Sequence, residues 1–306
     1  MSELRFDDRV AVITGAGRGL GRAYALLLAA RGARIVVNDL GVSLKGEGGD
    51  AGPAEDVVRE IKAAGGQAIA NTDSVATPAG GKAVIQSALD HFGRIDILIH
   101  NAGIVRRGSL EELSYEDFER VLDVHLRGGF HVVRPAFPLM AKAGYGRIVM
   151  TSSINGLYGN ANVVNYSVAK AGLIALSNVA ALEGAAKGIK SNAIIPAAVT
   201  RMSEGVDTSA FPPMDPERVA PAVAYLAHEN CAMTGELLIS AAGRVARAFP
   251  AESRGVYRSA WTIEDIAANI DAIRSTASPE VFSVVPHGHI DHLRYSFAMT
   301  KGSAGK

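Results

Sequence analysis

Apolar residues follow two patterns along the chain, and the two patterns alternate. Short runs rich in β-branched residues, such as residues 9–14, predict buried strands, whereas apolar residues three and four apart, as in residues 22–31, predict helices. The predicted strands occupy residues 9–14, 33–39, 67–71, 95–101, 146–152, 190–195 and 236–240. The predicted helices occupy residues 22–31, 54–64, 78–92, 115–142, 164–186 and 216–228. This alternation predicts right-handed βαβ units on a parallel sheet.

These units predict an α/β protein with a single main domain. Helices on both faces of such strands give a Rossmann-type, doubly wound parallel sheet of about seven strands. We expect this main domain to span residues 1–243 and a C-terminal extension to span residues 244–306. In the extension, Thr262 is a candidate cap for a helix over residues 263–274.

Composition and charge narrow the classes of function. Of the 306 residues, 48% are hydrophobic and 20% charged, which is enough apolar material for a sizeable core. Lys plus Arg and Asp plus Glu each total 31, without a basic block, so we expect neither nucleic acid nor a membrane as a partner. Cys231 is the single cysteine, which excludes an internal disulfide and a thiolate metal cluster within one chain. With no apolar signal core and no run of ~20 apolar residues, we expect a cytoplasmic location.

A glycine-rich segment follows the first predicted strand and opens the first predicted helix. It reads Thr-Gly-Ala-Gly-Arg-Gly-Leu-Gly over residues 14–21. Glycines at this spacing let the backbone turn sharply, admit a pyrophosphate and pack the helix on the sheet, while helix amides point at the anion. Asp39 ends the next strand about 20 residues further on, where a carboxylate accepts hydrogen bonds from an adenosine ribose. The pattern predicts a nicotinamide dinucleotide site; the alternative is a tight structural turn with a solvated Asp39.

Residues near this turn bear on the choice of cofactor. Asp39 repels a 2′-phosphate, which favours NAD over NADP. Arg18 is the counterweight, because a guanidinium beside the turn can pair with a 2′-phosphate. Residues 41–53 combine glycines with polar residues, and we expect them to form a mobile loop beside the cofactor end of the sheet.

A candidate acid/base pair lies in the helix predicted over residues 164–186. Tyr166 and Lys170 are four residues apart, so their side chains share one helix face. A free tyrosine has a pKa near ~10, and a neighbouring ammonium favours its phenolate. This spacing also arises by chance, but Ser153 closes the preceding strand, so strand end and helix face can meet at the carboxyl edge of the sheet.

Together these motifs resemble the short-chain dehydrogenase/reductase family over residues 7–243. The matching positions are Thr14-Gly15-x-x-x-Gly19-x-Gly21, Asp73-x-Val75, Asn101-Ala102-Gly103, Ser153, Tyr166-x-x-x-Lys170, and Asn192 with Pro196. The resemblance implies that Tyr166 is the acid/base, that Lys170 holds the nicotinamide ribose and lowers the pKa of the tyrosine, and that Ser153 orients the substrate oxygen. It also implies that Asp73 and Val75 flank the adenine and that Asn101 supports the sheet near the cofactor.

The site residues expected from the motifs and the resemblance form two sets. The candidate catalytic residues are Ser153, Tyr166, Lys170 and His125. The candidate cofactor-binding residues are Gly15, Arg18, Gly19, Leu20, Gly21, Asp39, Asp73, Ser74, Val75, Asn101, Ala102, Gly103, Tyr166, Lys170, Pro196 and Thr200. We expect no resident metal.

Two positions depart from the family's pattern. His125 stands where the family usually has an asparagine that anchors a water in a proton relay. An imidazole can hold or relay a proton, or it can make an ordinary hydrogen bond in the helix. Pro196-Ala197 replaces the usual Pro-Gly, which changes the loop around the nicotinamide, whereas Thr200 keeps a hydroxyl for the carboxamide.

Four short strings narrow the resemblance to one subgroup. They are Val124-His125-Leu126-Arg127-Gly128, Asn38-Asp39-Leu40-Gly41, Tyr145-Gly146-Arg147-Ile148 and Gly156-Leu157-Tyr158-Gly159-Asn160. They resemble the (3R)-hydroxyacyl-CoA dehydrogenase part of peroxisomal multifunctional enzymes of type 2 and bacterial relatives. This implies an acyl-CoA substrate in lipid metabolism, a homodimer or homotetramer, and an extension that covers the active site or contacts a subunit. The alternatives are a hydroxysteroid or other free-alcohol dehydrogenase, a 3-oxoacyl reductase, or an NAD-binding module without turnover.

Two further segments carry candidate functions. Met202–Met214 is a candidate substrate lid whose Met, Phe and Pro side chains can pack an acyl chain; a flexible loop of no specificity is the alternative. His287-Gly288-His289-Ile290-Asp291-His292 matches the His-x-His-x-Asp-His zinc string of metallo-β-lactamase-like hydrolases. That site needs its own scaffold and downstream ligands, so we expect a polar tail here.

Overall fold

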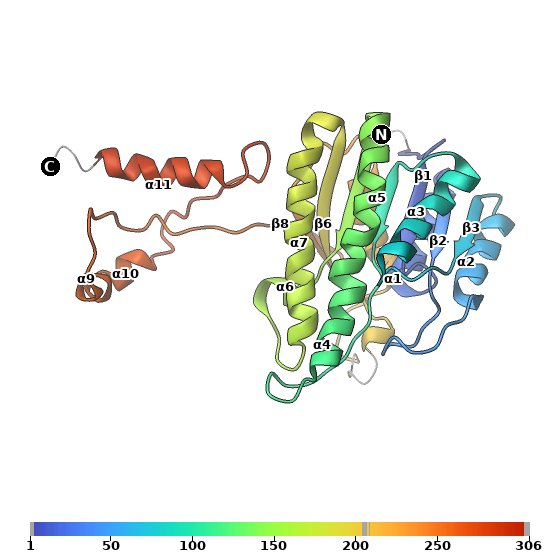
Figure 1. Ribbon diagram of the computed structural model, residues 1–306, viewed down its shortest axis with the longest axis horizontal. Coiled ribbons are helices and arrows are strands. Elements are labelled where there is room, and N and C mark those ends of the chain that lie inside the picture. Colours follow the sequence, from blue (N-terminus) through green and yellow to red (C-terminus); the bar gives the residue numbers. More distant parts are fainter. Residues whose placement is uncertain (1–2, 204–206, 208, 303–306) are drawn as a thin grey trace. The chain divides into compact units, whose positions relative to one another are not determined.

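The computed structural model describes residues 3–203, 207 and 209–302, and its main body is built on one eight-stranded sheet (Figure 1). The strand order is β3-β2-β1-β4-β5-β6-β7-β8. The first seven strands are β1 (Val10–Thr14), β2 (Arg34–Asn38), β3 (Gln67–Asn71), β4 (Ile97–His100), β5 (Gly146–Thr151), β6 (Ile189–Ala197) and β7 (Leu237–Ala241). All pairs among these seven are parallel. The predicted Rossmann-type, doubly wound fold is confirmed, with one strand more than expected.

The order of the strands reverses beside β1. Strand β1 pairs with β2 on one side and with β4 on the other, so that Thr14 lies between Asn38 and His100. At such a switch point the connections leave the strands toward opposite faces, and a crevice opens at the carboxyl ends. The glycine-rich turn follows β1 directly, which places it in this crevice.

Helices cover both faces of the sheet (Figure 1). One layer consists of α1 (Gly19–Ala30), α2 (Gly52–Ala63) and α8 (Ala220–Ala227), and the other of α3 (Pro78–Phe92), α5 (Gly128–Ala143) and α7 (Val164–Gly184). The strands carry continuous apolar runs because both faces are buried: all five residues of β1 and all six of β5 are inaccessible to solvent.

The long helix expected over residues 115–142 is formed by three consecutive helical segments. Helix α4 (Tyr115–Leu122) is followed by a π-helical turn, Asp123–Arg127, and then by α5. Ser114 caps α4 by accepting a hydrogen bond from the amide of Asp117 at 3.1 Å. π-Helical turns insert a residue into a helix and occur often at functional sites. This one carries His125.

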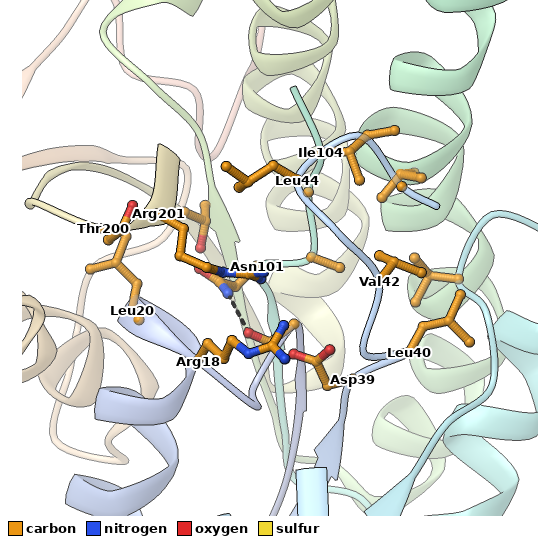
Figure 2. A pocket seen from close by; sticks show the side chains of 18 of the residues that line it. Arg18, Leu20, Asp39, Leu40, Val42, Leu44, Asn101, Ile104, Thr200 and Arg201 are labelled. Carbon is orange, nitrogen blue, oxygen red and sulfur yellow. Dashed lines mark hydrogen bonds between the residues drawn. The ribbon is translucent and has the colours of Figure 1, made fainter. Parts of the chain in front are cut away.

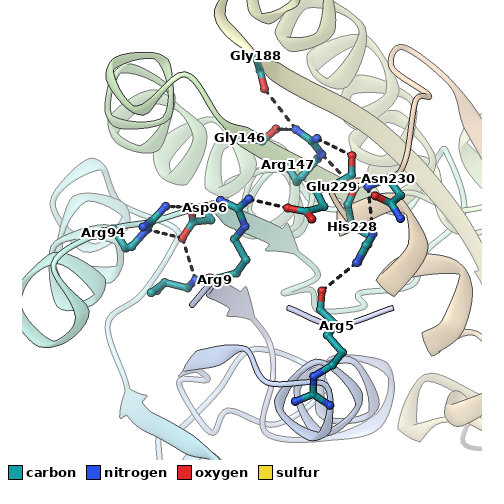
Figure 3. A network of polar contacts seen from close by, with 11 residues as sticks. Arg5, Arg9, Arg94, Asp96, Gly146, Arg147, Gly188, His228, Glu229 and Asn230 are labelled. Carbon is teal, nitrogen blue, oxygen red and sulfur yellow. Dashed lines mark hydrogen bonds and ion pairs between the residues drawn. The ribbon is translucent and has the colours of Figure 1, made fainter. Parts of the chain in front are cut away.

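A polar network ties the amino ends of the strands together, at the edge opposite the crevice (Figure 3). The buried carboxylate of Asp96 accepts hydrogen bonds from the Val10 amide at 2.9 Å, from Arg9 at 3.3 Å and from Arg94 at 2.6 and 2.8 Å. Arg147, also buried, donates to the carbonyls of residues 228 and 229, both at 3.2 Å. Such buried charges are tolerated because each has several partners.

Several elements were missed in the sequence. The eighth strand, β8 (Arg244–Ala248), follows β7 after a two-residue turn, and its arginines leave it mostly exposed at the sheet edge. Helix α6 (Asn155–Tyr158) has only one turn, and α11 (Ile290–Gly302) lies in the extension. Neither β8 nor α11 has apolar residues at the regular spacing by which a strand or helix is recognised in a sequence.

Residues Met1–Arg247 and Ala248–Lys306 form two compact units. The second unit contains α9 (Ile263–Ala268), α10 (Ile270–Ile273) and α11. Thr262 caps α9 as expected, in a capping box with Asp265. None of the side chains described in this unit is fully buried, so it has no closed core of its own.

One helical segment, Val164–Lys187, is long and apolar enough to cross a membrane by length and composition alone. It corresponds to α7 and the short 3₁₀ turn that follows. This segment packs against β5, β6, α4 and α6, and it carries buried polar residues such as Asn165 and Lys170. It is the kind of long apolar helix that the core of an α/β sheet protein also uses.

Candidate active site

A cavity of about 660 Å³ lies at the carboxyl ends of the strands, around the switch point. Every candidate cofactor-binding residue except Gly21 lines it. Figure 2 shows Asp39 and Arg18 close together in it, with Asn101 nearby and with Leu44 and Ile104 in another part of the wall. The structure therefore brings together residues that are far apart in the sequence, in the place that parallel α/β sheets use for ligands.

The glycine-rich turn is built as the sequence predicts. Gly15 and Gly19 have φ of 64° and 52°, the left-handed region that favours glycine. Gly21 lies behind the cavity wall, and a Cβ there would be 2.2 Å from the carbonyl oxygen of Gly15. The Asn101 side chain donates to this same carbonyl at 3.0 Å, which ties the turn to the end of β4. The amino end of α1 thus faces a cavity wide enough for a phosphate group.

Asp39 is held in a fixed position by the backbone. One carboxylate oxygen accepts a hydrogen bond from the Gly17 amide at 2.8 Å, and the other accepts one from the Gly41 amide at 2.8 Å. Each oxygen keeps a further lone pair for another donor. A carboxylate fixed in this way is arranged to accept hydrogen bonds from a diol at the cavity wall.

The candidate acid/base pair lies in the same cavity. The Nζ of Lys170 is 5.4 Å from the centre of the Tyr166 ring and donates to the Thr151 carbonyl oxygen at 2.6 Å. Burial lowers the pKa of Lys170 to about 7. Lys170 is fixed on the strand side as well, because the hydroxyl of Ser152 donates to its backbone carbonyl at 2.8 Å.

The pKa of Tyr166 is shifted in the direction opposite to the expectation. Burial of the phenol raises its pKa, and a hydrogen bond with Ser153 offsets part of this rise. The expected lowering by Lys170 does not dominate, because removing the phenol from water penalises its charged form and the lysine itself is partly neutral near pH 7. Ser153 does not line the cavity, but its hydrogen bond with Tyr166 places its hydroxyl beside the phenol.

His125 makes an ordinary hydrogen bond and also touches Tyr166. Its Nε2 lies 2.8 Å from the carbonyl oxygen and 3.0 Å from the amide of Ile104. Its ring meets the Tyr166 ring edge-on, with centres 5.3 Å apart. Burial lowers the pKa of His125 well below its usual value, so the ring is neutral. Among the described residues its Nδ1 has no hydrogen-bond partner. The geometry therefore supports a hydrogen-bonding residue that positions Tyr166.

His100 was not singled out in the sequence. Thr14 Oγ1 accepts hydrogen bonds from the amides of Asn101 and Ala102 at 3.0 and 3.1 Å, which leaves its hydroxyl hydrogen for His100 Nδ1 at 3.0 Å. On the other side of the ring, His100 Nε2 lies 2.8 Å from the carbonyl oxygen of His125 and must carry the hydrogen. Burial lowers the pKa of His100 to about 4, which agrees with this neutral form. His100 thus holds the π-helical turn of His125 against the end of β1.

Gly103 makes room for this arrangement. A Cβ at Gly103 would lie 2.3 Å from Cε1 of His125. The glycine of the Asn101-Ala102-Gly103 motif is therefore required by the histidine ring as well as by the cavity. No local sequence pattern signals this contact, because Gly103 and His125 lie 22 residues apart and meet only in the folded chain.

Two candidate segments remain, the possible substrate lid and the histidine-rich string of the extension. Of Met202–Met214, residues 204–206 and 208 lie outside the described residues; within the rest, Met214 lines the cavity and Phe211 is half exposed. In the extension, His287 pairs with Asp291 and His292 pairs with Glu252, each at 2.9 Å. No group of three or more His, Cys, Asp or Glu residues in the described part of the chain could hold a metal ion.

Comparisons with known proteins agree with this geometry. The model of the family described as short chain dehydrogenase matches residues 9–209. The chain belongs to the short-chain dehydrogenase/reductase family. It is 51% identical over 242 residues to peroxisomal multifunctional enzyme type 2 of Drosophila melanogaster, which covers 79% of this chain and 40% of that protein. A short-chain type dehydrogenase/reductase of Mycobacterium tuberculosis is 45% identical over 268 residues, covering 86% of this chain and 92% of that protein.

A solved structure gives the same result in three dimensions. The full-length multifunctional enzyme type 2 of Drosophila melanogaster superimposes with a TM-score of 0.82 at 38% identity, over 99% of this chain and 51% of that one. The resemblance to this subgroup is confirmed. The chain spans about 40% of the length of the fly enzyme, so the activity of the whole relative is not carried over. An oxidoreductase that acts on CH–OH groups is what the family supports.

Proposed function

We propose that this protein is an NAD-dependent dehydrogenase of 3-hydroxyacyl-CoA thioesters. The observation that carries the proposal is a single cavity that joins Asp39 at one end to Tyr166 and Lys170 at the other. A carboxylate that binds a ribose and an acid/base next to a buried lysine are the two ends required by a nicotinamide-dependent oxidation. The family membership supports the reaction type, and the subgroup resemblance supports the substrate.

Each residue of the candidate catalytic set has a different role in alcohol oxidation. NAD, when bound, accepts the hydride from the carbinol carbon. Tyr166, as phenolate, takes the proton of the substrate hydroxyl, so that the carbon–oxygen single bond becomes a carbonyl. Ser153 holds the substrate oxygen beside the phenol, and His125 fixes the ring from the side. Lys170, anchored on the Thr151 carbonyl, favours the phenolate to the extent that it is protonated.

The alternative to an acyl-CoA substrate is a free alcohol. A peroxisomal hydratase-dehydrogenase-epimerase of Neurospora crassa is 43% identical over 99% of this chain, whereas a cyclohexanol dehydrogenase of an Acinetobacter species is 42% identical over 63%. Leu40, Val42, Leu44 and Ile104 give the cavity an apolar wall beyond the cofactor motifs. A kcat/KM for a 3-hydroxyacyl-CoA no higher than for the same hydroxy acid without CoA would rule out the thioester.

Asp39→Ala tests the preference for NAD. Removing the carboxylate deletes the acceptor for the ribose hydroxyls and the repulsion of a 2′-phosphate. We expect NAD affinity to fall about tenfold, the effect of one lost charge-assisted hydrogen bond, and the NAD/NADP ratio of kcat/KM to fall further. Asp73→Ala, at an exposed residue of the same cavity, should leave that ratio nearly unchanged. An unchanged ratio in Asp39→Ala would mean that another residue reads the ribose.

The raised pKa of Tyr166 gives a direction for the pH dependence. Oxidation needs the phenolate, and a raised pKa leaves the phenol protonated at neutral pH, so kcat/KM for oxidation should rise from about pH 7 to about pH 10. Reduction uses the protonated phenol, which stays fully populated below the raised pKa, so its rate should stay nearly constant over the same range. Rates measured in both directions across this range test the assignment, and an oxidation rate that falls with pH would contradict it.

We also propose a homodimer or homotetramer. Exposed apolar residues on the helix layer formed by α5 and α7, among them Phe130, Val168 and Val179, support a subunit contact there. The coreless extension supports a contact of its own with another surface. Light scattering of the intact protein measures the state directly, and a monomer at micromolar concentration would exclude both contacts.

A further inference from the structure

The loop between β2 and α2, which lies in the segment expected to be a mobile loop, is folded on itself by backbone hydrogen bonds. We call residues 40–50 the strap. Its base is closed by the Asp50 amide, which donates to the Leu40 carbonyl at 3.1 Å. Its tip is closed by two further backbone hydrogen bonds between residues 43 and 46 and between residues 43 and 47, at 3.0 and 2.9 Å. Compact loops of this size whose ends lie close together are often functional.

The strap crosses over the site of the glycine-rich turn. It begins directly after β2, and at its tip the Val105 amide donates to the Leu44 carbonyl at 2.9 Å, in the segment that follows β4. Strand β1 lies between β2 and β4, so a segment that joins their carboxyl ends passes across the end of β1. Figure 2 shows Leu40, Val42 and Leu44 along this path at the cavity wall.

Arg106 fastens the strap to the body of the protein. Its Nε donates to the carbonyl oxygen of Lys45 at 3.0 Å, and one Nη lies 3.4 Å from the carboxylate of Glu47. The other Nη pairs with Asp117 on α4. The Arg106 side chain is only 17% exposed, so these bonds are partly shielded from water and stronger than those of a surface pair.

The same residue is connected to the catalytic helix. The buried side chain of Asn165 donates to the carbonyl oxygens of Arg106 and Asp117 at 3.1 and 3.2 Å. The oxygen of the same amide group accepts a hydrogen bond from the Tyr166 amide at 2.8 Å. The segment that fastens the strap therefore also fixes the first turn of α7, directly before the acid/base.

We propose that the strap is a gate over the cofactor and that Arg106 is the positioning residue that holds it closed. A dinucleotide that extends from Asp39 to Tyr166 lies under the strap, so it leaves only after the contacts of residues 44–47 with residues 104–106 have broken. The rate of cofactor release is then set by these contacts, and release of the reduced cofactor is a common limit on kcat in dehydrogenases that close over their ligands. The inference rests on the proposed binding of a nicotinamide dinucleotide in this cavity.

A reversible cross-link tests the gate most sharply. An ideal Cβ on Gly46 would lie 3.9 Å from the Cβ of Ile104, within the range of a disulfide. The double variant Gly46→Cys, Ile104→Cys should therefore lock the strap on oxidation, and Cys231, the only natural cysteine, is buried and does not interfere. Gly46 has a φ of 81°, which disfavours a cysteine, so the reduced double variant is the reference for the oxidised one. With NADH as the probe, we expect oxidation to slow both binding and release by more than about tenfold, and dithiothreitol to restore both rates.

The fastening by Arg106 is tested separately in the full chain. Arg106→Gln should raise the rate of NADH release about tenfold, as expected for one lost charge-assisted hydrogen bond, with a smaller change in the rate of binding. Arg106→Lys, which keeps the charge, should recover part of the effect. Arg107→Gln, at the exposed neighbouring arginine, is the matched control and should release NADH at the wild-type rate.

The outcomes distinguish the gate from the proposed function. Wild-type protein that binds neither NADH nor NADPH would overturn both. NADH binding with unchanged release in the oxidised cross-linked protein and in Arg106→Gln would overturn the gate and leave the proposed function standing. A fall in thermal stability of Arg106→Gln without faster release would assign Arg106 a structural role only.

Discussion

Tyr166→Phe should lower kcat for alcohol oxidation by about a thousandfold, because the phenyl ring fills the same space but has no oxygen to accept the substrate proton. Affinity for NADH should change by less than about twofold, since the hydroxyl is not expected to carry the binding of the dinucleotide. The edge-on contact with His125 depends on the ring and is preserved in this variant. Steady-state rates and NADH titration together separate the loss of chemistry from a loss of binding.

The control for this variant is Tyr158→Phe. Tyr158 is 79% exposed and belongs to the same part of the chain, at the end of α6. The variant Tyr158→Phe also loses a phenolic oxygen, and its kcat should equal that of the wild type. If Tyr166→Phe kept more than about a tenth of the wild-type kcat, the proton would have to move through another group, and the role of the pair Tyr166 and Lys170 would be wrong.

Gly21→Ala should have the second largest effect, and it should act through the backbone. The added Cβ would lie 2.2 Å from the carbonyl oxygen of Gly15 and 2.7 Å from the side-chain nitrogen, Nδ2, of Asn101. Both contacts are far shorter than atoms allow, so the glycine-rich turn must move away from α1. We expect affinity for NADH to fall by more than about tenfold and the free energy of unfolding to fall by about 1–3 kcal/mol.

A second variant in the same helix is the control for this prediction. Ala30→Gly lies at the exposed last residue of α1, where glycine costs less than the ~0.5–1 kcal/mol that it costs in a helix interior. Its NADH affinity should remain that of the wild type. Equal losses of affinity in both variants would mean that binding follows the general stability of α1 and that the turn has no specific role.

The sequence predicts the sheet well because its strands are buried on both faces. The runs of β1 and β4 and residues 148–150 of β5 are apolar, and short apolar runs of this kind are typical of strands buried on both faces. The exposed strand β8 was missed because Arg244 and Arg247 leave no apolar run in its five residues. The π-helical turn at His125 was missed for a different reason: it depends on the hydrogen bond from His100 to a backbone carbonyl, which no local pattern encodes.

The site shows the same division. The motifs place Asp39, Tyr166 and Lys170 in one cavity because each follows a recognisable strand end or helix spacing. The direction of the Tyr166 pKa could not be predicted, since it depends on how completely the phenol is buried. The strap was expected to be mobile from its glycines. Its contact with Arg106 could not be predicted, because Arg106 lies about 60 residues further along the chain and meets the strap only in the folded state.

The most direct test of the account is the formation of NADH from a panel of alcohols by the purified wild-type protein. The panel contains 3-hydroxyacyl-CoA thioesters of both configurations, the corresponding free hydroxy acids and simple secondary alcohols, each with NAD and with NADP. We predict NADH formation from the (3R)-thioesters, faster with NAD than with NADP and abolished by Tyr166→Phe. Binding of NADH without oxidation of any member of the panel would contradict this account and identify the protein as a dinucleotide-binding module.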